Sequence, residues 1–473
     1  MSTLLLPGGM GSLPVRIGKL SVWLAALVCV LTLNGCATYS SSFVTIEQQL
    51  AGQRYDDALK TIEAKSKSKT ERVLYLLNKG MVQRIKRDFA ASNQSLEAAK
   101  QEMERLYAAS ISENALSFVV NDATVSYAGD DYEQVLVHLY MALNYLELGQ
   151  RDEARVEALQ VDTKLREIGE KIPANKFTED ALSRYLTGMI YEELGEWSDA
   201  MIAYRKAYEA YQKYQRDFSV AVPDMLKLDL VRLAQRQGLS DELARYRKEF
   251  GMAPPPKKKA VADDPEGELV FILNNGLAPI KREKVINTWA PPPSVVVDAS
   301  KPSSAVASAP PIMVSIALPY YESRPARVWS ARISVSGKQA STQLMEDIDA
   351  IARASLDARM PAITARAVAR AVAKGVIQES VDKAGKNRND DAVQFFGSML
   401  VRIVSVATER ADTRSWLTLP ANVQLARLAL PPGSYTVTVD LLGEGEQIIA
   451  TQNYSGIVIS KNRKTYLTQH SLP

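Results

Sequence analysis

The sequence predicts a mainly α-helical protein: an N-terminal solenoid of helical hairpins, followed by a C-terminal α+β domain of antiparallel, sandwich-like strands around a helical insert. Two segments of the first half repeat one spacing of small and aromatic residues, which is typical of paired helices. Past residue 265 the apolar pattern changes to short, alternating stretches typical of strands. We therefore divide the chain into a leader (1–35), a repeat domain (36–250), a Pro/Lys-rich linker (251–265) and an α+β domain (266–473).

The leader has the pattern of a secretory signal. Arg16 and Lys19 precede the apolar run at 22–33, and this run is too short for a membrane-spanning helix, which needs ~20 apolar residues. The next four residues, LNGC at 33–36, resemble the lipobox of bacterial lipoproteins. This resemblance implies that the mature chain starts at a lipidated Cys36. An ordinary signal peptide that is cut elsewhere is the alternative.

The residue after the lipobox bears on localisation. Ala37 stands there, and the absence of Asp resembles lipoproteins of the outer membrane rather than those retained in the inner membrane. The resemblance implies a periplasm-facing protein whose acyl chains each add about 0.8 kcal/mol per buried CH₂ to membrane binding. Either Met1 or Met10 can start translation, because residues 10–19 alone form an adequate basic segment.

Composition argues against several classes of function. Cleavage before Cys36 removes Cys29, the only other cysteine, so we expect no thiolate metal site and no disulfide. The chain has only two histidines, and no HExxH, GxSxG or phosphate-loop motif occurs. Loss of the leader lowers the formal charge from +3 to +1, which offers no electrostatic case for nucleic acid. We expect no cofactor, no metal and no catalytic residue.

The clearest repeats are ALNYLELGQRDEARVEALQ at 142–160 and GMIYEELGEWSDAMIAYRKAY at 188–208. In the second copy, Gly188 and Ala200 are small residues that let two helices approach, and Tyr204 fills the space beside them. These segments resemble tetratricopeptide repeats. The resemblance implies stacked helical hairpins with a concave groove that binds a peptide or protein partner. Core packing is the simpler explanation for the aromatic residues.

Weaker copies and an insertion complete this half. GQRYDDALKTI at 52–62 has the pattern of a repeat turn and second helix, related residues follow 34 positions later, and a further helix is predicted over 222–248. A loop at 121–132 interrupts the array and contains candidate partner-binding residues. A network of hydrogen bonds within the turn is the alternative. The candidates are Asn121, Asp122, Asp130, Asp131 and Tyr132.

Strand-like stretches dominate the α+β domain. They lie at 267–273, 312–318 and 328–336 and again between 430 and the C-terminus. The Pro/Ser-rich segment 290–311 is predicted to be flexible. A helical insert is predicted over 341–409, with Pro361 at a helix start.

Two groups in this domain are further candidates for partner binding. Arg366, Arg370 and Lys374 share one helical face and form a basic ridge that could meet lipid headgroups, glycan carboxylates or an acidic protein; a solvated face is the alternative. The second group lies in the segment 409–428, as a recognition loop or as structural pairing. It comprises Arg410, Asp412, Arg414 and Trp416.

Several blocks together resemble an uncharacterised bacterial family of repeat-bearing lipoproteins. They include NDATVSYAGDDYEQV, GELVFILNNGLAPIK and ADTRSWLTLPANVQLARLALPPGSY, and they cover most of the mature chain. No activity is established in that family. Its members are often encoded near small lipoproteins that resemble activators of peptidoglycan synthases, so the resemblance implies an architecture and a cell-envelope setting.

We therefore expect a non-enzymatic, lipid-anchored scaffold or adaptor of the cell envelope. Its expected partners are the membrane, envelope proteins such as other lipoproteins, and peptidoglycan. Two alternatives remain: a glycan- or peptidoglycan-binding module acting through Trp416 or the Arg366 ridge, and a cell-wall hydrolase whose carboxylates come together only in the fold.

Overall fold

The computed structural model describes residues 43–112, 125–253, 266–290, 312–385 and 410–472. The predicted lipidation site Cys36, the candidates Asn121 and Asp122 and the side chain of Lys374 lie outside the described residues. So does most of the linker and of the Pro/Ser-rich segment.

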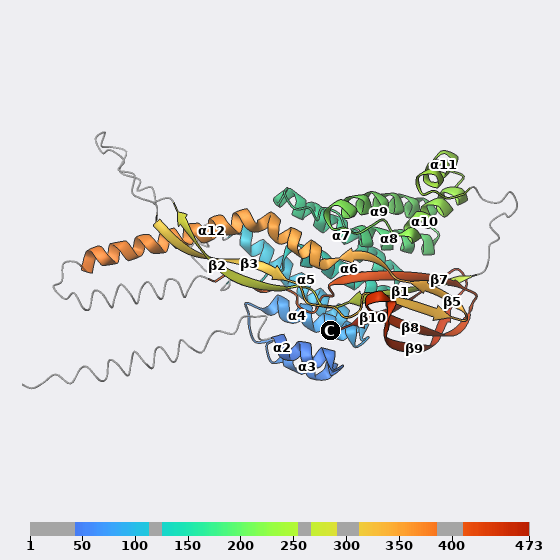
Figure 1. Cartoon of the computed structure of the whole chain (residues 1–473), viewed down its shortest axis with the longest axis horizontal. Coiled ribbons are helices and arrows are strands. Elements are labelled where there is room, and N and C mark those ends of the chain that lie inside the picture. The colour runs from blue at the N-terminus through green and yellow to red at the C-terminus, as the bar shows by residue number, and fades with distance from the viewer. Residues whose placement is uncertain (1–42, 113–124, 254–265, 291–311, 386–409, 473) are drawn as a thin grey trace, which may run out of the picture.

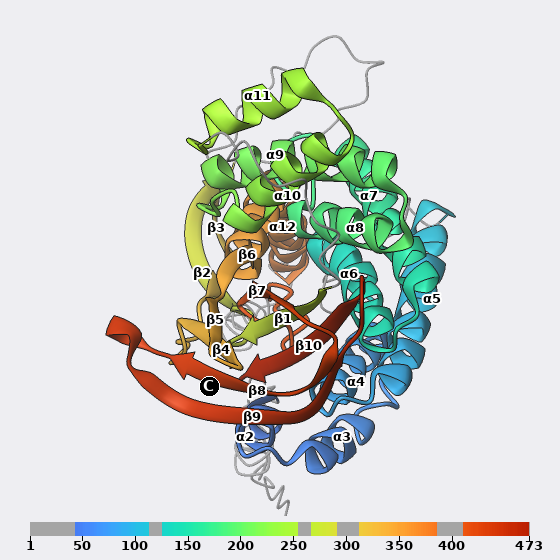
Figure 2. The same cartoon turned by 90° about the vertical axis from the view of Figure 1, so that its right-hand side faces the viewer.

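The N-terminal half consists of helices that pack in consecutive pairs, which confirms the predicted TPR-like solenoid. Each helix contacts the next one along the chain, and successive pairs stack into an arc (Figures 1 and 2). The pairs are α2 (Val44–Ala51) with α3 (Tyr55–Glu63), α4 (Arg72–Ile85) with α5 (Phe89–Ser112), α6 (Asp131–Glu147) with α7 (Arg151–Lys171), α8 (Ala181–Leu194) with α9 (Trp197–Asp217), and α10 (Asp224–Arg236) with α11 (Ser240–Glu249).

The small residues of the repeats allow the close helix packing that their spacing predicts. A Cβ atom added to Gly188 on α8 would lie 2.4 Å from the ring of Tyr204 on α9, so only glycine permits this approach. In the preceding weak repeat, a Cβ on Gly80 would lie 2.8 Å from Leu96. Tyr204 is fully buried, which fits core packing for this aromatic residue.

Two local predictions in this half are wrong. Residues 222–248 form two helices instead of one, because the chain turns at Gly238, whose φ of +69° is a left-handed conformation that glycine adopts readily. Asp131 and Tyr132 do not belong to a loop, because they form the first turn of α6. Acidic residues are common in loops and also at helix starts, and here Asp130 is the N-cap of that helix.

The described residues of the second half form three sheets. Their strand orders are β10-β1-β7-β6, β2-β3 and β5-β4-β8-β9, and all pairs are antiparallel except β1 with β10. The strands are β1 (Gly267–Asn275), β2 (Ile280–Ala290), β3 (Ile312–Glu322), β4 (Ser330–Val335), β5 (Lys338–Ser341), β6 (Gln343–Asp347), β7 (Asn422–Leu430), β8 (Gly433–Leu442), β9 (Ile448–Ile459) and β10 (Lys464–Ser471).

The first sheet is a central layer that is buried on both faces. On β1, Leu269 and Phe271 point to the sheet that contains β4 and β8, and the two four-stranded sheets enclose a common core as the predicted sandwich requires. Val270 and Ile272 point the other way and join the core of the solenoid helices. This two-sided burial explains why β1 reads as a nearly continuous apolar run.

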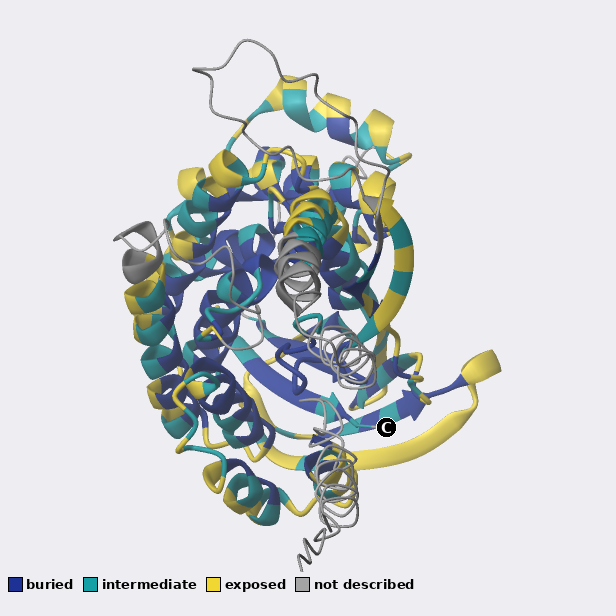
Figure 3. Cartoon of the chain, turned by 90° about the vertical axis from the view of Figure 1, so that its left-hand side faces the viewer, coloured by how far each residue is buried: buried dark blue, intermediate teal, exposed yellow. Residues whose placement is uncertain are grey.

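The inner face of the solenoid is therefore occupied by the chain itself. Figure 2 shows the helices curving around the strands, and Figure 3 shows buried residues throughout the layer between them. Polar contacts cross this layer: Tyr140 donates to Asn274 Oδ1 at 3.1 Å, and Thr418 donates to Asn78 Oδ1 at 2.9 Å. The predicted open concave groove is absent from the described residues, because the central sheet fills it.

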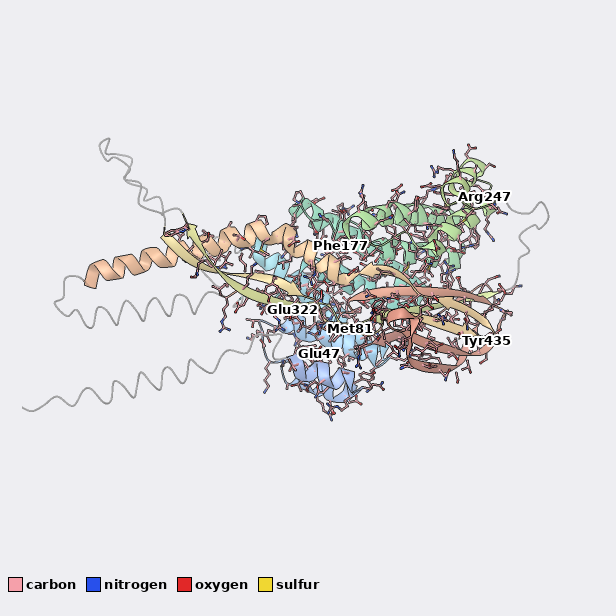
Figure 4. The ribbon with its side chains drawn as sticks, in the orientation of Figure 1. Glu47, Met81, Phe177, Arg247, Glu322 and Tyr435 are labelled. Atoms are coloured by element: carbon pink, nitrogen blue, oxygen red, sulfur yellow. The ribbon has the colours of Figure 1, made fainter. Side chains whose placement is uncertain are left out.

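The side-chain view agrees with this arrangement. In Figure 4, Met81 lies among the side chains between helices and sheet, whereas Arg247 and Tyr435 lie at outer ends of the molecule. Met81 is fully buried. Among the described helices, none is long and apolar enough to span a membrane.

A long arm extends from this body. It consists of α12 (Ile348–Gly385) and the β2-β3 hairpin, which pack together through Ile316, Leu318 and Ala367 (Figure 1). The insert predicted over 341–409 is partly wrong, because 343–347 is strand β6 and α12 begins only at Ile348. Its last part, 386–409, lies outside the described residues. Pro361 lies inside α12 and does not start a helix.

Candidate functional site

A polar cleft of 140 Å³, called the arm cleft below, lies where the arm meets the solenoid. It collects candidate residues from three separate parts of the sequence, which no local pattern could show. The residues that line it are Asp130, Asp131, Lys281, Ala317, Pro319, Ser355, Leu356, Arg359, Ile363, Arg366, Arg370, Ala411 and Asp412.

The start of α6 supplies the two aspartates. Asp130 and Glu133 form a capping box, in which Glu133 accepts a hydrogen bond from the backbone N–H of Asp130 at 3.2 Å. This cap fixes the backbone so that both aspartates point toward the arm. Lys281 on β2 donates to Asp130 at 2.5 Å, and Arg359 on α12 donates to Asp131 at 2.6 Å through Nε.

Burial and the ion pairs shift the pKa values of the two carboxyl groups in opposite directions. Burial would raise the pKa of Asp130, but the charges of Lys281 and Arg359 outweigh it, so the pKa is lowered. Burial raises the pKa of Asp131 although Arg359 acts in the opposite direction. Tyr321 adds a hydrogen bond to Asp130 at 2.9 Å. The pairs hold the base of the arm against the solenoid.

Glu133 is a second buried acid beneath the cleft. It accepts hydrogen bonds from the Tyr127 hydroxyl and from the backbone N–H of Trp416, both at 2.6 Å. Burial, followed by the charge of Asp130, raises its pKa to about 7. Glu133 does not line the cleft, so its contacts connect α6 to the segment before β7 and serve the fold.

The predicted basic ridge is divided by the structure. Arg366 is exposed at the rim of the cleft and forms no ion pair with the described residues, whereas Arg370 is buried and lines the cleft wall. The ridge is thus not a solvated face over its whole length, because β3 packs against α12. Ser355, which is buried in the same wall, has a hydroxyl without a hydrogen-bond partner.

The segment 410–416 serves the fold more than recognition. Arg414 pairs with Asp412 at 2.7 Å and donates to the backbone oxygen of Val125 at 2.8 Å, so it connects this segment to the solenoid. Trp416 is completely buried against Tyr140, with ring centroids 6.0 Å apart. Stacking of Trp416 on an external sugar or peptide is therefore wrong for this conformation. Arg410 is half-buried, and Asp412 lines the cleft.

Of the predicted candidates, the structure brings Asp130, Asp131, Arg366, Arg370 and Asp412 together in one cleft. Tyr132 lies just beneath, with its hydroxyl 3.2 Å from that of Tyr321. Sequence reasoning missed Lys281, Ser355 and Arg359, because they lie in ordinary strand and helix patterns. The aspartates that pair with Lys281 and Arg359 are more than a hundred residues away in the sequence.

The cleft can hold a charged or polar segment of a partner. Its wall combines cations with aspartates that are already paired, and Arg366 offers the accessible positive charge at the rim. In the described residues, no group of three His, Cys, Asp or Glu side chains could hold a metal ion.

Known proteins resemble this chain in part. No family model and no curated protein matches it. Among solved structures, MamA is 14% identical, with 43% of this chain and 91% of that chain covered and a TM-score of 0.28. A tetratricopeptide repeat protein from Parabacteroides merdae is 15% identical, covering 45% of this chain and 67% of its own at a TM-score of 0.28. Neither likeness says what this chain binds.

Proposed function

We propose that this chain is a non-catalytic, lipid-anchored scaffold or adaptor protein of the bacterial outer membrane, facing the periplasm and binding envelope proteins. The observation that supports it best is the closed inner face of the solenoid: the central sheet fills the place where a repeat groove would hold a peptide. Partners therefore meet the outer surfaces, and the arm cleft is a polar, indented site that gathers several candidate residues there.

The chemistry of the arm cleft favours an acidic partner segment. Asp130 and Asp131 are neutralised by Lys281 and Arg359, while Arg366 remains accessible and has no ion pair among the described residues. A carboxylate of the partner can bind the Arg366 guanidinium through two parallel hydrogen bonds. The arm cleft also fits an acidic group of peptidoglycan, and the adducts expected below separate the two.

Photo-crosslinking in cells tests this proposal. A photoreactive residue in place of Arg366 should give an adduct with a discrete envelope protein, which mass spectrometry identifies. The same residue in place of Lys206, which is exposed on the distant helix α9, is the matched control. Adducts that are identical at both positions, or that contain only peptidoglycan, would argue against a protein adaptor acting through the arm cleft.

Lipidation is tested separately. The motivating observation is the LNGC sequence that ends at Cys36. Cys36→Ala should move the protein from the membrane fraction to the soluble periplasmic fraction, and mass spectrometry of the wild-type N-terminal peptide should find acyl chains on Cys36. An unmodified N-terminus inside the cytosol contradicts the envelope part of the proposal and leaves the arm cleft untouched.

A further inference from the structure

A second, larger cavity of 480 Å³ lies on the other side of the molecule, between the α2-to-α5 helices and strands β8, β9 and β10. It is here called the edge cavity, because β9 and β10 are the edge strands of their sheets. Its volume falls within the range of about 300–1,000 Å³ that is usual for small-molecule sites. It shares no lining residue with the arm cleft.

A buried guanidinium lies in its wall. Arg84, on the last turn of α4, is only 1% exposed, and it donates to the side chains of Asn144 and Thr468, both of which are neutral. It forms no ion pair within the described part of the chain, and its Nε has no acceptor. Burial lowers the pKa of Arg84. A buried cation with neutral partners is costly unless an anion approaches it.

Neighbouring charges leave a positive excess. Arg87 donates to the backbone oxygen of Thr468 at 2.9 Å and lies 3.5 Å from Glu147, which is buried. Arg327 is exposed at the rim and forms no ion pair with the described residues. No Asp or Glu lines the edge cavity itself. Glu147 therefore balances the charge of Arg87 and acts on Arg84, while Arg327 adds a further positive charge at the rim.

Two polar side chains on β10 are also unsatisfied. Gln469 is 4% exposed, and neither its amide nitrogen nor its amide oxygen has a hydrogen-bond partner among the residues that the structure describes. His470 has no partner at Nε2. Burial and the charges of Arg84 and Arg87 lower the pKa of His470 well below its ordinary value, so the imidazole is neutral and can donate or accept. Unpaired buried polar groups are destabilising, and a polar ligand that bonds to them would remove this cost.

From this arrangement we infer that the edge cavity is a binding site for an oxyanion-bearing ligand, a carboxylate or a phosphate, which is held by Arg84, Arg87 and Arg327. Gln469 and His470 provide hydrogen bonds to the polar groups next to the oxyanion. Tyr454, whose ring lies 6.0 Å from the Arg87 guanidinium, offers an aromatic wall for the rest of the ligand. This site is independent of the proposed partner binding at the arm cleft.

Titration of the purified full chain in detergent tests this inference. Inorganic phosphate and citrate are the probes, added at constant ionic strength against chloride, and calorimetry and the thermal unfolding midpoint are the readouts. We expect saturable binding of at least one probe, with a rise in the midpoint that chloride does not produce. The preferred probe distinguishes a phosphate site from a carboxylate site.

Variants locate the binding. Arg327→Gln changes an exposed side chain and should leave the fold intact. It should weaken binding of the preferred probe about tenfold, because one charge-assisted hydrogen bond is lost. Gln469→Leu should also weaken it. Arg245→Gln on α11, which lies at the opposite end of the molecule from α2 and α3 in Figure 2, is the control and should bind as wild type. Absence of any effect beyond chloride, or equal binding in all three variants, would overturn the inference.

Discussion

At the scale of single residues, buried acids without cations make stability depend on pH. Glu346 on β6 is fully buried and forms no ion pair with the described residues. It points inward because the β6-β7 register shifts between Leu344 and Glu346, so that Met345 and Glu346 are both buried. Burial, followed by the charge of Asp180, raises the pKa of Glu346 well above its ordinary value.

The sign of the pH dependence follows from this raised pKa. The folded state keeps the proton on Glu346 at pH values where the unfolded chain has lost it, so stability falls as pH rises above the unfolded pKa. Asp180, whose pKa burial raises to about 6, adds to the loss between about pH 4 and 6. Glu346→Gln should therefore raise the free energy of unfolding at pH 8, by about 2 kcal/mol, and change it little at pH 4.

Urea unfolding at the two pH values measures this difference. Asp357→Asn, on the first half of α12, is the control, because it removes an exposed acid instead of buried Glu346 or Asp180. A Glu346→Gln variant that is destabilised equally at pH 4 and pH 8 would contradict the prediction, because the effect would then not depend on ionisation of the carboxyl group.

Among glycines, Gly188 and Gly169 give a matched pair. Both lie within helices, but a Cβ at Gly188 meets Tyr204 at 2.4 Å, and a Cβ at Gly169 meets nothing within 4 Å. Gly188→Ala should lower the free energy of unfolding by about 1–3 kcal/mol through overpacking, despite the better helix propensity of alanine. Gly169→Ala should raise it by up to about 1 kcal/mol. Thermal or chemical unfolding of the two variants decides this, and equal effects would refute close hairpin packing.

At the scale of elements, the arm is held to the solenoid by few contacts. One of them is the ion pair between Arg359 on α12 and Asp131 on α6. The Asp131 side chain is 8% exposed, less than the 21% of Asp130, which pairs with Lys281. The arginine side chain is 38% exposed, so solvent reduces the strength of the pair. The arm should therefore loosen when this pair is lost, without unfolding of the body.

A double-mutant cycle measures that pair. Arg359→Ala leaves Asp131 buried and unpaired and should cost about 2 kcal/mol, whereas adding Asp131→Ala should recover part of this loss. Hydrogen exchange should show faster exchange in α12 and the β2-β3 hairpin, with the central sheet unchanged. Additive effects of the two substitutions would show that the pair does not couple the elements.

At the scale of the whole molecule, the solenoid and the central sheet share one hydrophobic core. Helices α4, α6 and α8 contribute buried residues to the same cluster as Ile272, Val423 and Leu425 of the sheet. Separating the two halves would expose the apolar surface between them, at a free-energy cost of about 25 cal/mol for each Å² exposed.

A fragment of residues 43–253 should show this dependence. We expect helical circular dichroism, but also binding of a hydrophobic dye and a broad unfolding transition, because the inner helical faces lose their cover. The full chain, which should bind little dye and unfold cooperatively, is the control. A monomeric fragment that unfolds cooperatively and binds no dye would show that the solenoid is an independent domain.

The sequence by itself determined the local architecture. Helical hairpins follow from spacings within about 20 residues, such as Gly188 with Tyr204, and strands such as β1 follow from short apolar runs, because both depend on neighbours in the chain. Strands β2, β6 and β7 lie outside the stretches that the sequence predicts as strands. The tertiary structure alone decided that the sheet fills the solenoid, that Trp416 is buried and that Asp130 meets Lys281. Those contacts join distant segments, and the apolar pattern of one segment does not specify which distant segment will cover it.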